Sequence, residues 1–313
     1  MFRFRFLHTG AARLWGPRLL LVFVCLALVN SALAQPADLD AAQNWLLAAQ
    51  AENGGWSDGL SERSGPGITV ESVLALRALG ADPAQVAPEA GDFLRRYTNQ
   101  NITTFTPGLA AQMALGALAL GADPRDFSSV DLLARAATLD DETGLYGGTV
   151  YDHCQVVLAW RAAGEAPPDE ALMRIPEAAH PDGGWGFAPE SPRDTATTAL
   201  CLQALHNLPG IDRTPGLDYL RAAQNPDGGW PFQRPSPFTT GSDAYSTAQV
   251  IMTLNTLGAD LADWNNPQTT LAAFQAPDGG FDYLGSELPA ARVWATTSAI
   301  RALSGAPVFD LSS

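Results

Sequence analysis

A short unit that ends in two glycines and an aromatic residue recurs along the chain, and this repetition constrains the fold more than any other feature. The clearest copy runs from Tyr219 to Trp230 and reads Tyr-Leu-Arg-Ala-Ala-Gln-Asn-Pro-Asp-Gly-Gly-Trp. The other copies lie at residues 45–56, 93–97, 144–148, 180–185 and 271–281, of which 93–97 lacks the glycine pair and 144–148 is degenerate. We therefore count six units of about 46 residues each.

Each unit predicts two helices. A short amphipathic helix stops at the Pro-Asp-Gly-Gly sequence, where glycine supplies positive φ and the aspartate forms a local turn bond. The helix that follows is rich in Ala, Leu, Val and Thr almost all round, which favours an inner, fully packed layer. These inner segments include residues 71–80, 112–121, 155–164 and 249–258. Because neither end of the array shows a polar capping repeat, we predict an all-α, closed (α/α)6 toroid of six helical hairpins.

The first 34 residues have the features of a secretory signal peptide. Four arginines precede an apolar run over residues 19–29, and Ala32-Leu33-Ala34 provides an A-x-A cleavage site. The apolar run is short for a membrane span, although an uncleaved N-terminal anchor is the alternative. We expect cleavage after Ala34, a single toroid domain over residues 35–313, no membrane span after cleavage, and a secreted or periplasmic protein.

Composition excludes several classes of function. Charged residues make up 16% of the chain, and its basic residues are 18 arginines with no lysine, so P-loop and Schiff-base chemistry are ruled out. The formal net charge is −15, and residues 35–313 carry 33 acidic residues against 14 arginines. A polyanion is therefore not an expected partner, which excludes nucleic acid.

The repeat Leu-x-x-x-Gln-Asn-Pro-Asp-Gly-Gly-Trp resembles that of the terpenoid-cyclase and protein-prenyltransferase superfamily, which includes the squalene cyclases. The resemblance covers nearly all of residues 35–313. It implies an inner ring of helices around a central cavity, with a ligand bound at one mouth. The same toroid also serves corrinoid carriers and complement-like proteins, so the fold alone does not decide the function.

The family's catalytic motifs are missing or incomplete. Protonation-initiated cyclisation uses Asp-x-Asp-Asp, which does not occur, and Asp140-Asp141-Glu142 lacks the distal aspartate of a diphosphate-ionising motif. The pair Asp152 and Cys154 resembles half of the prenyltransferase zinc site, but Thr197 stands where the histidine ligand belongs. We therefore expect no metal and no cofactor.

The starts of the inner helices carry the candidate site. Asp194 and Asp243 each precede two hydroxyl residues, a pattern typical of an N-cap, and they are also the best candidates for a catalytic acid. If these helix ends surround the cavity mouth, their polar and aromatic side chains converge on a ligand. The predicted rim residues are Glu71, Asp152, His153, Asp194, Asp243, Tyr245, Arg292 and Trp294. The repeat aromatics Trp56, Trp185, Trp230 and Phe281 are interpreted as wedges between hairpins.

Two cysteines remain after cleavage, Cys154 and Cys201, and they fall on consecutive inner helices. Helices that pack about 8–10 Å apart leave the two α-carbons near the upper limit for a disulfide. We expect two free, buried thiols, although export supplies oxidising conditions that permit a bridge.

We expect a cavity that binds a hydrophobic or amphipathic small molecule, isoprenoid-like or corrinoid-like, without processing it. Two alternatives stay open. One is an isoprenoid-processing enzyme, of terpene cyclase or prenyltransferase type, with a non-standard acid. The other is a structural or protein-binding toroid of an envelope complex.

Overall fold

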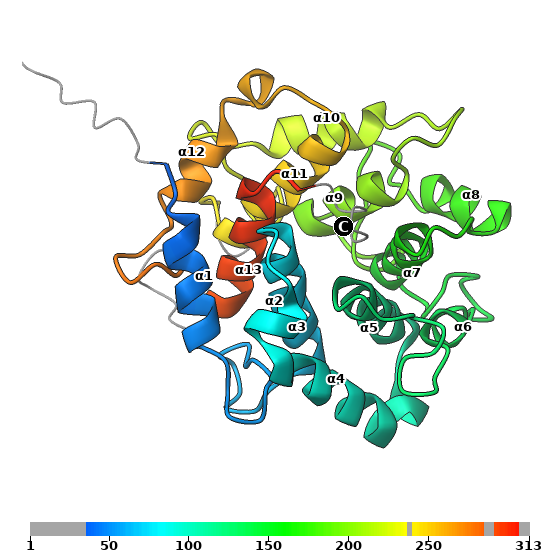
Figure 1. Cartoon of the computed structure of the whole chain (residues 1–313). Coiled ribbons are helices and arrows are strands. Elements are labelled where there is room, and N and C mark those ends of the chain that lie inside the picture. Colours follow the sequence, from blue (N-terminus) through cyan, green and yellow to red (C-terminus); the bar gives the residue numbers. More distant parts are fainter. Residues whose placement is uncertain (1–35, 237–239, 285–290, 307–313) are drawn as a thin grey trace, which may run out of the picture. The chain divides into compact units, whose positions relative to one another are not determined.

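Six helices form a closed inner ring in the computed structural model, which describes residues 36–236, 240–284 and 291–306. Each packs against the next along the chain, and the last, α13, packs against the first, α2, so that the red and cyan helices lie side by side in Figure 1. The described chain is all-α, and the prediction of a closed toroid of six hairpins is confirmed. The inner helices are α2 (Pro66–Ala78), α5 (Pro107–Ala119), α7 (Val150–Ala162), α9 (Thr195–Ala204), α11 (Ala244–Thr256) and α13 (Arg292–Leu303).

An outer helix covers each inner one. Every outer helix packs on the inner helix that precedes it in the chain, and α1 packs on α13, so the outer layer also crosses the point where the ring closes. The outer helices are α1 (Leu39–Ala48), α4 (Pro88–Asn101), α6 (Leu132–Ala136), α8 (Asp169–Glu177), α10 (Thr214–Ala223) and α12 (Pro267–Ala272). Three short elements join them, namely α3 (Pro83–Val86), η1 (Ile102–Thr104) and η2 (Leu261–Trp264).

The repeat aromatics pin the two layers together. Trp56, Trp185 and Trp230 are buried, and each indole Nε1–H donates at 2.7 Å to a carbonyl of the outer helix ten residues earlier. Phe281 is also fully buried. A large apolar side chain that also satisfies an outer-helix carbonyl explains why the repeat retains tryptophan. These residues are wedges between layers, as the sequence indicated.

The glycine pair of a turn has two different tasks. Gly228 has φ of +90°, as the sequence predicted for a turn glycine, whereas the backbone of Gly229 stays outside the left-handed region. Gly229 is needed for space, because a Cβ there would lie 2.7 Å from Cβ of Ser242. The Asp227 carboxylate accepts the Gly229 N–H at 2.9 Å, which is the predicted local turn bond.

Cys154 and Cys201 form a disulfide between α7 and α9, with α-carbons 5.2 Å apart. The expectation of two free thiols was therefore wrong. An interaxial spacing of about 8–10 Å is measured between helix axes, whereas facing α-carbons each stand about 2.3 Å from their own axis toward the partner. The α-carbons are consequently much closer than the axes, and well within reach of a bridge.

The predicted signal peptide lies at residues 1–34, outside the described residues. Within the part of the chain that the structure describes, no helix has both the length and the apolar character needed to cross a bilayer.

Candidate functional site

One recurring hydrogen bond sets the register of the inner helices. The backbone N–H of the repeat aromatic donates to a side chain near the start of an inner helix, at distances of 2.8 to 3.1 Å. Five inner helices are therefore in register at their acceptors, Thr69, His153, Thr198, Thr247 and Thr296. Two positions earlier on three of these helices stand Tyr151, Tyr245 and Trp294, which are at equivalent places in the ring.

Five side chains from four inner helices meet inside the ring, and we call them the central cluster: Glu71, Tyr151, Tyr245, Trp294 and Arg301. The Tyr245 hydroxyl donates to that of Tyr151 across the intervening helix α9. Trp294 meets Tyr245 edge-on at 6.2 Å between ring centroids. Because α7 and α11 are not neighbours in the ring, the contact between Tyr151 and Tyr245 shows that both side chains point toward the centre of the ring.

The central cluster also contains a buried ion pair. Arg301 of α13 donates to Glu71 of α2 at 2.5 Å, and their side chains are 14% and 10% exposed. The surrounding protein displaces water from the two tyrosine hydroxyls and, with Glu71 nearby, raises the pKa of Tyr151 to about 12. The same burial, together with Tyr151 and Glu71, raises the pKa of Tyr245 well above its usual range. Both tyrosines are thus neutral hydrogen-bonding groups over a charged pair.

A cavity of about 240 Å³ adjoins this cluster, lined by Tyr245, Tyr283, Ala291 and Trp294. Tyr283 follows the repeat aromatic Phe281 by two residues, and its carbonyl accepts the N–H of Ala244 at the start of α11. The cavity therefore lies at the N-terminal ends of the inner helices, as the sequence predicted for the mouth.

Equivalent loops place two more aromatic residues at the same end of the ring. The carbonyl of Phe187 accepts the Tyr151 N–H, and that of Phe232 accepts the Thr195 N–H. Phe187 stacks on Tyr151 at 5.8 Å, and the two phenylalanines are 52% and 40% exposed. Two large aromatic residues are thus exposed at equivalent places near the N-terminal ends of the inner helices.

Asp194 and Asp243 are N-caps of α9 and α11. Asp194 accepts the Thr197 N–H at 2.7 Å and the Thr197 hydroxyl at 2.8 Å, whereas no described residue donates to Oδ2 of Asp243. Their exposed fractions are 4% and 1%. Burial, opposed by the N-cap hydrogen bonds, raises the pKa of each to about 6.

Asp152 lies in the first turn of α7, whose N-cap is Thr149. Its carboxylate packs against Gly108 of the neighbouring inner helix α5 and accepts the Gly108 N–H, while burial raises its pKa. A Cβ on Gly108 would come within 2.1 Å of Oδ1. Asp152 therefore ties α7 to α5.

Five of the eight predicted rim residues lie outside the central cluster: Asp152, Asp194 and Asp243, described above, and also His153 and Arg292. His153 is fully buried, accepts the Tyr146 N–H at Nδ1 and lies 2.8 Å from the Ala171 carbonyl at Nε2, so it replaces the threonine of other repeats. Arg292 is paired with Asp278 and Asp282, and its guanidinium covers Trp45 of the outer helix α1. Both side chains therefore contact a repeat turn and an outer helix, and a ligand contact at either residue stays a prediction.

Cys154 of the Asp152–Cys154 pair, which resembles half of a zinc site, forms a disulfide and therefore cannot bind a metal ion as a thiolate. Among the described residues, no three or more His, Cys, Asp or Glu side chains gather in a way that could hold a metal ion. The absence of a bound metal stays a prediction.

Sequence reasoning missed Tyr151 and Arg301. Tyr151 precedes His153 by two residues, as Tyr245 precedes Thr247 and Trp294 precedes Thr296, so alignment of the inner helices on the acceptor would have found it. Arg301 lies seven residues after Trp294, two helical turns further along the same face.

Several solved structures have a fold similar to that of this chain. The chain is similar to the type II terpene cyclase MstE from Scytonema, with a TM-score of 0.63 and 16% identity over 85% of this chain and 96% of that one. A substituted form of that cyclase, in complex with geranylgeranyl dihydroxybenzoate, matches with a TM-score of 0.64 and 15% identity over 87% and 97%. The protein has the α/α toroid fold of these terpenoid-cyclase-like proteins.

The same fold carries other functions. Haptocorrin in complex with Cbi matches with a TM-score of 0.57 and 14% identity over 87% of this chain and 67% of that one. A glycosidase matches with a TM-score of 0.56 and 12% identity over 86% and 96%. At these identities the likeness establishes the fold alone. No protein-family model and no curated protein matches the sequence.

Proposed function

We propose that the mouth of the toroid binds a small amphipathic molecule and releases it unchanged. The central cluster carries this proposal, because it combines aromatic faces with a buried ion pair and two neutral hydroxyls. A ligand's apolar body would lie against Tyr245, Tyr283 and Trp294, and its polar end would reach the Glu71–Arg301 pair. Sites of this kind, apolar with a few convergent polar groups, are typical of small-molecule binding.

The neighbours on this fold are consistent with such a ligand. MstE has been crystallised with geranylgeranyl dihydroxybenzoate, and haptocorrin with Cbi. An isoprenoid-like molecule with a polar head fits the apolar and polar parts of this site. We therefore take a polyprenyl alcohol as the first ligand to test.

Native mass spectrometry of the protein purified from its source provides the main test, followed by calorimetric titration with farnesol as a defined probe. We expect a co-purified mass that exchanges with farnesol. Replacement of Trp294 by Ala should weaken farnesol binding about tenfold or more, since a large aromatic wall of the cavity is lost. A ligand-free native protein that also does not bind farnesol at about 1 mM, far above the affinity of a specific site, contradicts the proposal.

An enzyme with a non-standard acid is the second candidate, favoured by the raised pKa of Asp243 and its Oδ2 without a hydrogen-bond donor. Against it, the exposed fractions of Asp194 and Asp243 are 4% and 1%, so neither carboxyl is open to a substrate. Chemical conversion of the bound molecule that is abolished by Asp243→Asn, with binding retained, would favour the enzyme.

We also propose that the protein is exported. The cleavage motif Ala32-Leu33-Ala34 supports this, and the Cys154–Cys201 disulfide is consistent with an oxidising compartment. Protein recovered from the source should begin at Gln35 by N-terminal mass spectrometry. Full-length protein retained in membranes would contradict export.

A further inference from the structure

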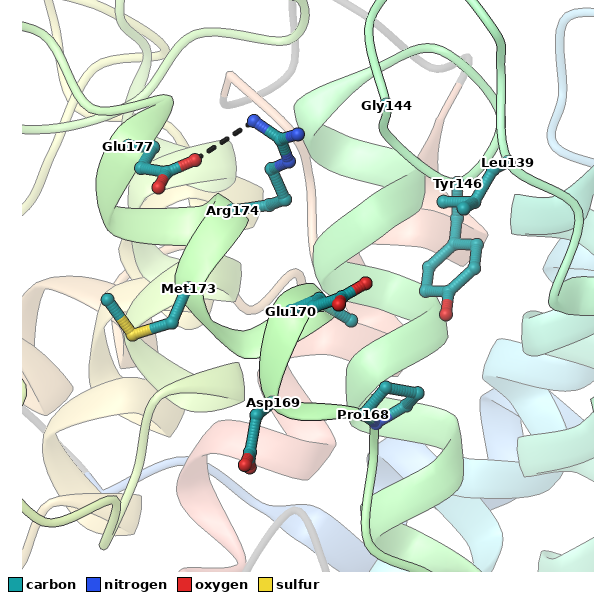
Figure 2. Close-up of a pocket in the computed structure, with 10 residues that line it drawn as sticks. Leu139, Gly144, Tyr146, Pro168, Asp169, Glu170, Met173, Arg174 and Glu177 are labelled. Carbon is teal, nitrogen blue, oxygen red and sulfur yellow. Dashed lines mark hydrogen bonds and ion pairs between the residues drawn. The ribbon is translucent and has the colours of Figure 1, made fainter.

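A second cavity lies outside the ring, between the degenerate repeat turn and the outer helix α8. It measures about 560 Å³, within the range of ligand pockets, and we call it the α8 cavity. Figure 2 shows its lining, with Tyr146 and Leu139 on one side and residues of α8 on the other. The lining residues are Leu139, Gly144, Tyr146, Pro168, Asp169, Glu170, Ala171, Met173, Arg174 and Glu177.

Comparison with the other repeats explains why the cavity exists. At four glycine turns, the first glycine lies directly on the backbone of the next outer helix or its start. A Cβ there would come within 2.1 to 2.7 Å of a backbone carbonyl oxygen, in the pairs Gly54–Glu89, Gly183–Pro215, Gly228–Asn265 and Gly279–Ala41. The equivalent Gly144 meets no such backbone, and its nearest neighbour is the Arg174 guanidinium at 3.4 Å. Helix α8 therefore stands away from its turn.

Helix α8 also lacks the aromatic ring that three other outer helices carry at this position. In three repeats the next outer helix lays an aromatic ring over the second glycine: Phe93 over Gly55, Tyr219 over Gly184 and Trp45 over Gly280. The carbonyl that accepts the repeat tryptophan's indole N–H belongs to the residue that follows Trp45 in α1 and Tyr219 in α10. In α8 that carbonyl belongs to the residue that follows Arg174, so Arg174 occupies the position of the aromatic residue. Leu145 replaces the second glycine.

The floor of the α8 cavity is held in place. Tyr146 is 5% exposed and stacks on His153 at 5.0 Å, and His153 is hydrogen-bonded through both ring nitrogens. Burial lowers the pKa of His153, which keeps the ring neutral. Because these side chains are already held in place, little conformational entropy is lost at this wall when a ligand binds.

The charges around the α8 cavity favour a cation. The lining includes three carboxylates, on Asp169, Glu170 and Glu177, and one arginine, Arg174, which is already paired with Glu177 at 3.0 Å. Glu170 lies near enough to Tyr146 to contribute to the raised pKa of its hydroxyl, after burial. Figure 2 shows the Glu170 carboxylate directed toward Tyr146 across the cavity.

We propose that the α8 cavity binds a small molecule that joins an aromatic ring to a positively charged amino group. The ring lies in the cavity between Leu139 and Tyr146 on one side and α8 on the other. The amino group reaches the Glu170 carboxylate and lies close to the Tyr146 ring. This site is separate from the central cluster, since its lining comes from the outer layer.

The test is calorimetric titration of the folded protein with tryptamine, an aromatic amine, and with indole-3-propionate, a matched anion. Tryptamine should bind, and the anion should bind at least about tenfold more weakly, because a charge-assisted hydrogen bond is replaced by repulsion. The proposal is overturned if tryptamine does not bind at about 5 mM, a concentration above the largest dissociation constant expected of a specific site. It is also overturned if the anion binds equally well.

Two variants locate the site. Glu170→Gln should weaken tryptamine binding about tenfold, whereas Glu52→Gln, the same change at an exposed residue of another turn, should leave it unchanged. Arg174→Trp places a large side chain at the wall of the cavity and should abolish tryptamine binding, with circular dichroism to show that the variant is folded. Unchanged binding in both Glu170→Gln and Arg174→Trp overturns the assignment. Farnesol binding at the ring mouth should persist in Arg174→Trp, which separates failure here from failure of the proposed function.

Discussion

Glu71 and Arg301 form an ion pair between α2 and α13, the two inner helices that close the ring. They are 230 residues apart in sequence, so the pair joins the first hairpin to the last. Two buried charges are stable here only because each neutralises the other. The pair therefore serves both ring closure and the polar part of the central cluster.

Removal of one partner should destabilise the protein. Glu71→Gln leaves the Arg301 charge without its carboxylate, and we expect the free energy of unfolding to fall by about 2–4 kcal/mol. Urea unfolding followed by circular dichroism measures the change. The double variant Glu71→Gln/Arg301→Met should recover part of the loss, because no buried charge remains. Equal stability of the single variant and the wild type would show that the pair does not hold the ring closed.

The disulfide should also stabilise the fold. It closes a loop of 47 residues in sequence separation, and its loss through Cys154→Ala/Cys201→Ala should cost about 2–4 kcal/mol. Thiol counting on denatured, unreduced protein beginning at Gln35 should find no free thiol. Two free thiols per chain would contradict the bridge.

The repeat made the fold predictable, because the glycine turns, the aromatic wedges and the small-residue inner helices all specify one hairpin. The central cluster was less predictable. Tyr151 and Arg301 lie outside the glycine-turn motif, and the packing of their side chains in one cluster depends on the register between helices far apart in sequence. Local pattern identified the N-caps Asp194 and Asp243, whereas the inward or outward direction of His153 and Arg292 required the packed structure.

The α8 cavity could not be predicted from the sequence either. The degenerate turn at residues 144–148 was visible in the sequence, but its consequence was not. Arg174 precedes Trp185 by the same spacing that separates Trp45 from Trp56, but only the packed helices show that a cavity lies there. A departure from a repeat thus predicts a local difference without specifying whether a cavity, a loop or a filled core results.

Glycine substitutions can separate backbone strain from steric clash. Gly80 has φ of +76°, and a Cβ at this position would have no other atom within 4 Å, so Gly80→Ala should cost only about 1 kcal/mol from the left-handed backbone. Gly228→Ala adds a contact of 2.7 Å with the Asn265 carbonyl and should cost about 3 kcal/mol or more.

Gly229→Val tests the second glycine of the same turn. Its Cβ would meet Ser242 and Thr270 within 3 Å, and we expect a cost of about 1–3 kcal/mol. All three variants are compared by urea unfolding. A Gly228→Ala protein no less stable than Gly80→Ala would contradict the close approach between the turn and the next outer helix.

The two buried N-cap carboxyls should make stability depend on pH in an unusual direction. The pKa of Asp194 and that of Asp243 are raised to about 6, above the usual value of about 3.9 in an unfolded chain. Between these values the folded protein binds more protons than the unfolded chain. Stability is therefore greatest below about pH 4 as far as these groups are concerned, and it is lost as the pH rises through about 6.

Comparison of variants isolates this contribution. Asparagine still caps a helix but does not titrate, so Asp243→Asn and Asp194→Asn should each lessen the loss of stability between pH 4 and pH 7, by about 2–3 kcal/mol. Asp278, whose pKa is lowered to about 2 by Arg292, is the control, because Asp278→Asn should leave the slope between pH 5 and pH 7 unchanged. Urea unfolding at several pH values provides the measurement. The prediction is contradicted if the free energy of unfolding changes between pH 4 and pH 7 by the same amount in the wild type and in both asparagine variants. That result would show that these carboxyls are ionised throughout this range.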